Sequence, residues 1–404
     1  MITYEEARAR VLQSVSPIDR TETVSLDDAL GRVLAQSMVA PFNVPNHANS
    51  AMDGYGLRHA DLSDAPTTTL TLAGEVAAGD FRAQPLEPGH AVRILTGAPI
   101  PPGCDCVVKQ EDVTVAGQQI TLPSNLALNN NIRPAGEDIA CGQTYLEPGK
   151  ALTPPDIGLL ASMDQTEIPV FARLRVAVLS TGNEVTPAGQ PLAPGRVYDS
   201  NRAALKAAIT ALGCECVDLG VAPDDLAAIE AALRDGAARA DAVITSGGVS
   251  VGDYDLVKVA LKNLGDIDYW KVRMKPGKPQ AYGVIGPARF FGLPGNPVSA
   301  MAVYLLIVRP ALLRMMGLAE QPENLLRLPL QGGWRKKHDR RDFLRARVHF
   351  QGAQSYVTTT GPQGSGVLSG MARANAFIAL PESPVVIADG DLVDVLLIDY
   401  APGV

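Results

Sequence analysis

Hydrophobic residues recur every three or four positions in the first segment of the chain. Residues 3–15 begin with a threonine and two acidic residues, the pattern of a capped helix start, and carry apolar side chains at helical spacing. A second short helix is predicted over residues 25–36, starting at Ser25. Pro41, Pro45 and the small polar run 47–54 then end the helical pattern.

From about residue 54 to 150 the pattern changes to short apolar stretches between turns. Strands are predicted at 68–76, 90–97, 106–115 and 118–122, with Gly and Pro closely spaced between them. The same texture returns after about residue 325, with strands at 325–333, 342–350, 355–360, 376–381 and 391–400. Two β-rich modules are therefore expected.

Strands and helices alternate between these modules, from Leu174 to about Gly317. Strands are predicted at 175–180, 214–220, 241–246 and 290–294, and helices at 201–213, 223–240, 255–265 and 298–317. A repeated strand, glycine-rich loop and helix predicts a parallel sheet with right-handed crossovers. The fold class is thus α/β with β-rich modules, in several domains.

The composition is that of a globular protein with a core. Of the 404 residues, 46% are hydrophobic and 19% are charged. The formal net charge of −8 argues against a dedicated nucleic-acid binder but leaves room for a local basic pocket. The acidic first segment is no signal peptide, and the longest apolar stretch, about residues 298–308, is too short to span a bilayer. We expect a soluble, cytoplasmic protein without nucleic-acid or membrane partners.

The cysteines and histidines form no metal-binding pattern. Cys104 and Cys106, like Cys214 and Cys216, lack the spacing of zinc or redox motifs. The cysteines are interpreted as small apolar side chains.

Three glycine-rich loops follow predicted strands, at 180–184, 245–252 and 292–297. In a parallel sheet, ligands bind at the carboxyl ends of the strands, where backbone N–H groups and helix N-termini attract anions. The loops therefore indicate a phosphate or oxyanion pocket, although turn geometry alone also explains each glycine.

Charged residues add to this picture. Lys275 and Lys278 flank a Pro-Gly turn just after Lys271, which suits a dense anion, although a solvated turn is the alternative. Carboxylates of Asp53, Glu184, Asp224, Asp253 and Asp255 suggest Mg²⁺. Helix capping alone would also explain Asp224 and Asp255.

Eight segments, in this order, resemble the molybdopterin molybdenumtransferase family, to which the E-domain of gephyrin also belongs. They are 50–55, 93–98, 131–138, 180–184, 199–201, 246–252, 275–279 and 292–297. The resemblance implies a Mg²⁺-dependent reaction in which adenylylated molybdopterin and molybdate give molybdenum cofactor and AMP. A non-catalytic molybdopterin-binding or scaffold protein of the same family is the alternative. An unrelated Mg²⁺-dependent nucleotide enzyme on the same fold is a third.

The resemblance also implies four domains and a homodimer. A helical dimerisation domain would comprise residues 1–40 and 138–172, a lateral β-rich domain 41–137, a central parallel-sheet α/β molybdopterin-binding-like domain 173–322, and a C-terminal β-barrel-like domain 323–404. The active site would lie at the subunit interface, between the α/β domain of one subunit and the β-rich domain of the other. Molybdopterin adenylyltransferase and molybdoenzyme maturation proteins are implied partners.

Site residues follow from the family's motifs and from charge. Molybdate is a dianion, so cationic and hydroxyl groups are assigned to it: Lys275, Lys278, Arg340 and Ser365. Glu184 and Asp255 are assigned to Mg²⁺, with Asp53 and Asp224 in catalytic support. Further substrate-binding residues are Thr96, Arg133, Asp138, Ser246, Gly247, Gly248, Ser250, Lys271, Pro294, Gly295, Asn296 and Pro297. Arg341 and Arg345 compete with Arg340, and Ser369 competes with Ser365.

Overall fold

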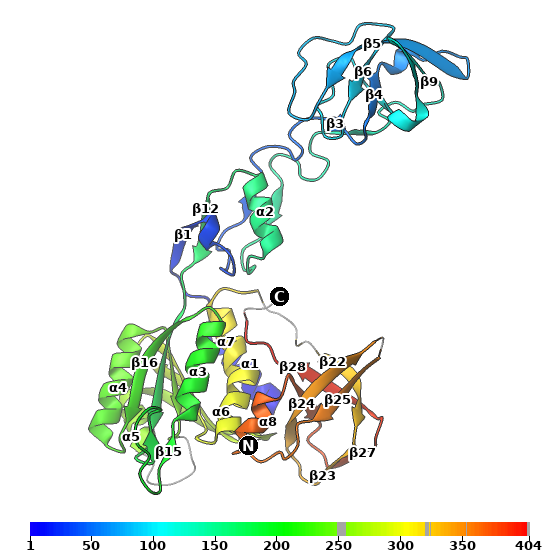
Figure 1. The fold of residues 1–404 in the computed structure, drawn as a ribbon. Coiled ribbons are helices and arrows are strands. Elements are labelled where there is room, and N and C mark those ends of the chain that lie inside the picture. The colour runs from blue at the N-terminus through cyan, green and yellow to red at the C-terminus, as the bar shows by residue number, and fades with distance from the viewer. Residues whose placement is uncertain (249–255, 320–322, 324, 353, 402–404) are drawn as a thin grey trace. The chain divides into compact units, whose positions relative to one another are not determined.

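The structure is a computed structural model that describes residues 1–248, 256–319, 323, 325–352 and 354–401 (Figure 1). It divides into two compact units. The first comprises Met1–Gln36, Pro148–Ile157 and Glu167–Val404, and the second comprises Ser37–Glu147 and Gly158–Thr166. Helix α2 (Pro154–Ser162) contains a boundary between the units.

A six-stranded sheet organises the α/β part of the first unit. Its order is β16 (Glu215–Ala222), β13 (Arg175–Thr181), β17 (Ala242–Ser246), β21 (Ala288–Leu293), β20 (Pro279–Ile285) and β18 (Gly265–Lys271). The first four strands run parallel, as predicted. Strands β20 and β18 join as antiparallel neighbours and were not predicted.

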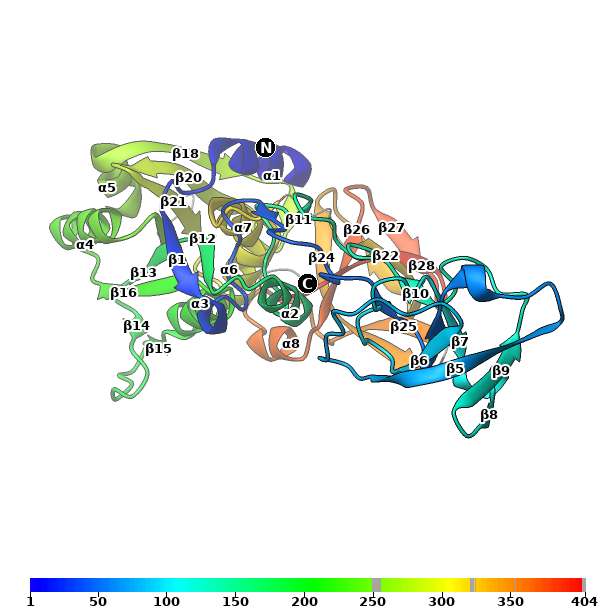
Figure 2. The ribbon, with the colours of Figure 1, turned by 90° about the horizontal axis from the view of Figure 1, so that it is seen from above.

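Helices cover both faces of this sheet because its strands are apolar on both sides. The helices are α1 (Tyr4–Ser14), α3 (Ser200–Ala211), α4 (Leu226–Arg239), α5 (Leu256–Leu264), α6 (Pro297–Val303) and α7 (Arg309–Met315) (Figure 2). Along β13, Val176 and Val178 pack into one core cluster with α1, α3, α6 and α7, whereas Ala177 and Leu179 pack into another with α4 and α5. A π turn, η4 (Tyr304–Val308), joins α6 to α7.

The segment from α6 to α7 corrects one expectation from the sequence. Pro297–Met315 forms 19 residues of continuous helix, long and apolar enough to cross a membrane by length and composition, so the expectation that this stretch is too short was wrong. Within the described residues, 72% of its most apolar window is buried inside the protein. Such burial is typical of a core helix.

The C-terminal part of the first unit is a closed barrel. Its ring runs through β24 (Arg341–Gln351), β25 (Gln354–Thr359), β22 (Leu325–Gln331), β28 (Leu392–Leu397) and β26 (Ala376–Leu380), and β26 pairs back to β24. Apolar side chains such as Leu344, Val357 and Val395 fill it. A two-residue strand, β19 (Met274–Lys275), pairs with the start of β24 and so joins the barrel to the α/β part.

Short elements complete the first unit. They are the pairs β1 (Thr21–Ser25) with β12 (Glu167–Phe171), β14 (Val185–Thr186) with β15 (Val197–Tyr198) and β23 (Trp334–Lys336) with β27 (Val385–Ile387), and helix α8 (Leu368–Ala372). The predicted helix over 25–36 is wrong: only a 3-10 turn forms, at Leu26–Asp28, and Gly31 follows at φ 73°. The left-handed conformation at Gly31 is incompatible with a continuing helix.

The second unit is β-rich, as predicted. Its sheet has the order β7 (Cys106–Lys109), β4 (Gly54–Leu57), β6 (His90–Ile94), β5 (Thr67–Val76), β9 (Gln119–Pro123) and β8 (Thr114–Ala116). The single strand predicted over 106–115 is two strands, because a 3-10 turn at Gln110–Asp112 interrupts it. Two small pairs accompany the sheet: β3 (Asn49–Ser50) with β10 (Ile132–Arg133), and β2 (Met38–Val39) with β11 (Thr144–Leu146).

The fold class is confirmed by the parallel central strands, the β-rich sheet and the barrel. The segments expected to form the helical domain hold α1 and α2 together with β1, β2, β11 and β12. Helix α1 packs on η4 and α7, with Tyr4 and Val11 buried in the α/β core. The four-domain borders remain a prediction.

Three of the five cysteines are buried, as interpreted. Burial raises the pKa of the Cys104 and Cys214 thiols to about 12 and that of Cys106 to about 11. Cys216 is partly exposed and Cys141 is exposed. The three buried thiols are therefore apolar fillers at neutral pH.

Candidate functional site

Three loops meet at the carboxyl ends of β13, β17 and β21. The parallel register aligns Ser180 with Ser246 and Ser246 with Leu293. Gly247 donates its N–H to the carbonyl of Leu293 at 3.1 Å, and a Cβ on Gly247 would lie 3.2 Å from the carbonyl and hydroxyl oxygens of Thr181. The predicted convergence of the glycine-rich loops is therefore present, and Gly247 permits their close approach at φ 96°.

Asn201, at the start of α3, ties two of these loops together. Its Nδ2 donates to the hydroxyl of Ser246 and to the carbonyl of Gly295, each at 2.7 Å. A carbonyl can only accept, so this contact fixes which end of the amide faces the loops. The Oδ1 atom is buried and has no hydrogen-bond partner among the described residues.

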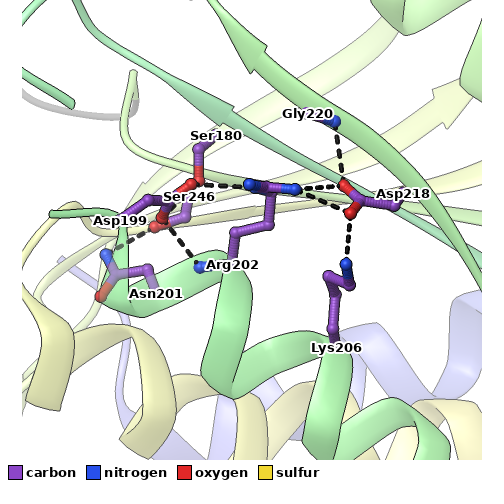
Figure 3. A network of polar contacts seen from close by, with 8 residues as sticks. All are labelled: Ser180, Asp199, Asn201, Arg202, Lys206, Asp218, Gly220 and Ser246. Atoms are coloured by element: carbon purple, nitrogen blue, oxygen red, sulfur yellow. Dashed lines mark hydrogen bonds and ion pairs between the residues drawn. The ribbon is translucent and has the colours of Figure 1, made fainter. Parts of the chain in front are cut away.

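A polar network holds the start of α3 in place (Figure 3). The buried Asp199 caps the helix by accepting from Arg202 N at 3.0 Å, and it also accepts from the Ser180 hydroxyl at 3.1 Å. The Arg202 guanidinium bridges Asp199 to Asp218, which Lys206 also contacts. Burial alone would raise the pKa of Asp218, but the bonds from Lys206 and Arg202 outweigh it and hold the pKa at about 2.

The loop after β13 presents Glu184. Gly182 has φ 129°, and a Cβ there would lie 2.4 Å from the Glu184 carboxylate, so the carboxylate folds back over this glycine. The neighbouring Asn183 exchanges hydrogen bonds with Asp224: Asn183 N donates to the carboxylate at 3.0 Å, and Asp224 N donates to the amide oxygen at 3.1 Å. Two exposed carboxylates therefore lie on linked loops.

The capping interpretation of Asp224 is wrong. The N-cap of α4 is Asp225, whose carboxylate accepts from Ala228 N at 2.9 Å. Asp225 therefore caps the helix, and the Asp224 carboxylate is hydrogen-bonded to the loop after β13. Asp255, Asp253 and Ser250 lie outside the described residues.

The donors fit Mg²⁺ in kind and only partly in number. Carboxylate oxygens are the protein ligands that Mg²⁺ takes, usually one or two of them beside water and substrate phosphate. Glu184 and Asp224 supply two carboxylates. No group of three or more His, Cys, Asp or Glu side chains that could hold a metal occurs within the described ranges.

The lysine turn lies at the same edge of the sheet. Strand β20 begins at Pro279, which pairs with Lys271 at the end of β18, and Ala281 pairs with Gly292 near the end of β21. The buried Gln280 fixes the turn, because its Nε2 donates to the carbonyl of Gly277 at 2.6 Å. Lys271 and Lys278 are exposed and Lys275 is half-buried.

Lys275 reaches the barrel as well. Its register partner in β24 is Asp342, and its Nζ lies 3.2 Å from Nε2 of His338. His338 Nε2 lies 3.2 Å from the carboxylate of Asp342, which is only 1% exposed. The basic turn therefore continues into a charged cluster at the start of the barrel.

The structure separates the three competing arginines. Arg341 pairs with Glu5 and stacks over Tyr4. Arg345 is fully buried and donates to the carbonyl of Pro362 at 2.7 Å. Within the described residues, the half-buried Arg340 has no side-chain partner, so it is the arginine free to bind an anion.

The competing serines also differ. Ser365 accepts a backbone hydrogen bond from Val298 N at 3.1 Å, at the start of α6 and next to the 294–297 loop. Ser369 belongs to helix α8. The Ser365 backbone is therefore joined to the start of α6, and the role of Ser365 stays a prediction.

In the second unit, Asp53 and Thr96 form a pair. Thr96 donates both its backbone N–H and its hydroxyl to one Asp53 oxygen, each at 2.7 Å. The hydroxyl bond and then the backbone bond lower the pKa of Asp53. Arg133 and Asp138 are exposed, on β10 and shortly after it.

Three residues in contact with the proposed site had no role in the sequence prediction. Asn201 lies in a segment that matches the family, yet nothing in the spacing marks its side chain as a clamp. Gln280 and His338 lie beside the lysine turn and beside Arg340, respectively, and only their neighbours carried a signal.

Three family regions match this chain in order. They are the MoeA N-terminal region (domains I and II) over residues 2–163, a probable molybdopterin binding domain over 177–314, and the MoeA C-terminal region (domain IV) over 327–398.

Relatives match nearly the whole length. A molybdopterin molybdenumtransferase of Haemophilus influenzae is 39% identical over 98% of both chains, and molybdopterin molybdenumtransferase 2 of Mycobacterium tuberculosis is 37% identical over 96% of both. The crystal structure of a molybdopterin biosynthesis MoeA protein from Pyrococcus horikoshii superposes with a TM-score of 0.83 at 32% identity, over 99% of both chains. The chain therefore belongs to the molybdopterin molybdenumtransferase family of enzymes.

Proposed function

We propose that the protein transfers molybdate to the dithiolene of adenylylated molybdopterin, forms molybdenum cofactor and releases AMP. The observation that carries this proposal is the meeting of three glycine-rich loops and a lysine turn at one edge of the α/β sheet. Backbone N–H groups and ammonium groups bind phosphate and oxyanions. The names of the relatives supply the molybdopterin and the molybdenum.

Molybdate binding is assigned to Lys275, Lys278, Arg340 and Ser365. The free guanidinium of Arg340 and the contact of Ser365 with the start of α6 support this assignment. These groups bind and orient the oxyanion, because a tetrahedral dianion needs donors on several sides.

The pterin and phosphate groups are assigned to the two clamped loops. Their residues are Ser246, Gly247, Gly248, Pro294, Gly295, Asn296 and Pro297, with Ser250 outside the described residues and with Lys271 exposed at the end of β18. The close approach of Gly247 to Thr181 and Leu293 supports a shared surface of backbone donors.

Mg²⁺ is assigned to Glu184 and Asp255, with Asp224 and Asp53 in support. When bound, it would neutralise negative charge on the pyrophosphate. The exposed carboxylate of Glu184 supports the assignment. The Asn183 contacts of Asp224 hold a second carboxylate on the linked loop.

The second unit and the assembly complete the proposal. Asp53, Thr96, Arg133 and Asp138 would act from the β-rich domain, at the subunit interface of a cytoplasmic homodimer. The Asp53–Thr96 bonds lower the pKa of Asp53, which favours the charged carboxylate that a supporting role would use. Molybdopterin adenylyltransferase and molybdoenzyme maturation proteins are the proposed macromolecular partners.

The test is an insertion assay. Purified protein is incubated with adenylylated molybdopterin and Mg²⁺, with and without molybdate, and AMP and molybdenum cofactor are measured. The proposal predicts that both products form only with molybdate and that omission of Mg²⁺ abolishes them. Tight binding of the pterin without AMP release would contradict it and favour the scaffold alternative.

A further inference from the structure

His338 lies between a cation and a buried anion at the barrel end of the proposed oxyanion site. Its Nε2 is 3.2 Å from Lys275 Nζ and 3.2 Å from Asp342 Oδ1. A single ring nitrogen either donates or accepts. If it carries the proton it can donate to Asp342 but faces the ammonium, and if it is bare it can accept from Lys275 but faces the carboxylate. One neighbour is therefore always unsatisfied.

Within the described part of the chain, the Asp342 carboxylate is the group that lacks a hydrogen-bond donor. Its Oδ1 is buried without a hydrogen bond among the described residues. A buried carboxylate without good donors is costly, so the group gains from any change that brings it a proton or a better donor.

Charged groups face this pair from every element around it. Lys275 from β19, Lys336 from β23 and Arg340 from the loop before β24 act on the pair directly. Asp339 from the same loop and Glu382, which follows β26, act on Lys336. Lys336 is only 3% exposed, and its ammonium donates to the carbonyls of His338, Glu382 and Ser383. These three bonds hold the ammonium in place, so Lys336 does not become a hydrogen-bond donor to Asp342. Arg340 N lies 3.4 Å from His338 Nδ1.

Burial shifts the pKa values of His338 and Asp342 in opposite directions. Burial lowers the pKa of His338, and Lys275, Lys336 and Arg340 lower it further against the opposing effect of Asp342. Burial raises the pKa of Asp342. The two titrations belong to the pair, since each group is a main influence on the other.

We propose that His338 and Asp342 take up a proton when an oxyanion binds at Lys275. This inference rests on the proposed function, which places the oxyanion there. A dianion adds negative charge beside the pair and draws the Lys275 ammonium to itself. His338 Nε2 is then free to donate to Asp342, and the added negative charge favours the protonated pair. His338 is thus a positioning residue that acts through Lys275.

Oxyanion affinity should fall as the pH rises. In the free protein, burial and the neighbouring cations lower the pKa of His338 and so favour its neutral form. Oxyanion binding favours the charged imidazolium, so a proton is taken up as the anion binds. With one linked proton, oxyanion affinity falls by up to about tenfold for each unit rise in pH.

The experiment is calorimetric titration of the full chain with sodium molybdate at several values between about pH 6 and 7, in buffers of different ionisation enthalpy. The slope of the heat against buffer enthalpy gives the number of protons taken up. Sodium sulfate is the second probe, because it stays a dianion over this range and so excludes protonation of the ligand itself. The expected result is an uptake of up to about one proton per anion with either probe.

Variants assign the proton. His338→Gln should abolish the uptake and flatten the pH dependence of affinity. His349→Gln should leave both unchanged, since His349 lies on β24, the strand of Asp342, but stacks on Tyr356 and contacts Thr358.

Binding of either anion by the wild-type protein without proton uptake would overturn this inference and leave the oxyanion site intact. An unchanged uptake in His338→Gln would also overturn it. Absence of binding by both anions would overturn the oxyanion site and this inference together. The wild-type measurement does not depend on any variant folding.

Discussion

Asn201 donates one amide group to both Ser246 and Gly295, at 2.7 Å each, and so holds two glycine-rich loops at a fixed separation. The residue itself is held by a helix start that Asp199 caps. The amide oxygen is buried and has no hydrogen-bond partner within the described part of the chain.

Substitution of Asn201 by Ala should weaken binding of the pterin substrate about tenfold, the effect of losing about 1.4 kcal/mol of hydrogen bonding. Asn201→Asp should weaken it more, since a carboxylate would face the Gly295 carbonyl. Fluorescence titration with molybdopterin measures the affinity. Asn263→Ala is the matched control, because the side-chain amide of the exposed Asn263 on α5 donates a 2.7 Å hydrogen bond to Glu230 on α4. Equal affinities of Asn201→Ala and Asn263→Ala would refute the clamp.

Thr96→Val should lower turnover about tenfold without loss of stability, because Asp53 loses one of two bonds that orient its carboxylate. Thr96→Ser should restore turnover. Initial rates of AMP release and thermal melting follow the two effects. Thr69→Val, which removes a 3.2 Å hydroxyl contact with Thr121 in the same sheet, should leave the rate unchanged. A rate loss matched by Thr69→Val would argue against a role for this pair.

Gln280→Leu should weaken molybdate binding about tenfold and leave pterin binding unchanged, since the carbonyl of Gly277 loses its 2.6 Å donor and the lysine turn loosens. The Tyr282 hydroxyl also loses its acceptor, so stability should fall by about 1–3 kcal/mol. Calorimetry and urea unfolding measure the two changes. Gln165→Leu, at a similar amide-to-carbonyl bond with Met163, is the control for molybdate affinity. A loss of pterin affinity equal to the loss of molybdate affinity would contradict the assignment of the lysine turn to molybdate alone.

Asp218 should make stability depend on acid pH. Its pKa is about 2 in the folded protein and about 3.9 when unfolded, so its stabilising effect is present above the unfolded value and lost as pH falls toward 2. Asp218→Asn should therefore show a smaller loss of stability between about pH 5 and pH 2 than the wild type. Urea unfolding at several pH values measures it, with Asp235→Asn, at a surface pair with Arg239, as control. Parallel pH profiles for the wild type and Asp218→Asn would contradict the assignment.

The sequence predicted elements well where one pattern acted alone. Buried strands such as 175–180 are apolar on both faces, and their glycine-rich ends lie together because parallel strands end at one edge. The edge strand β18 and its neighbour β20 were missed, since charged and small residues such as Asp266, Asp268 and Gly283 interrupt their apolar pattern. Residues 25–36 have helical spacing, but Gly31 and pairing with distant chain segments prevent the helix.

Within the site, charge and glycine spacing identified the loops and the lysine turn. They did not identify Asn201, Gln280 or His338, whose contacts join residues far apart in sequence. The distinction between Asp224 and Asp225 as a helix cap, and between Arg340 and its neighbours as a free cation, likewise depends on tertiary contacts that no local pattern encodes.

The lysine turn is proposed to bind the molybdate that the enzyme transfers. The most direct measurement is the rate of AMP release as a function of molybdate concentration for the wild type, Lys275→Ala and Lys262→Ala, the last an exposed lysine in the final turn of α5. Lys275→Ala should raise the molybdate KM at least about tenfold, because one charge-assisted contact is lost, and should leave the pterin KM unchanged. The kinetics of Lys262→Ala should match those of the wild type. AMP release that does not depend on molybdate, or a molybdate KM unchanged in Lys275→Ala, would contradict the proposal.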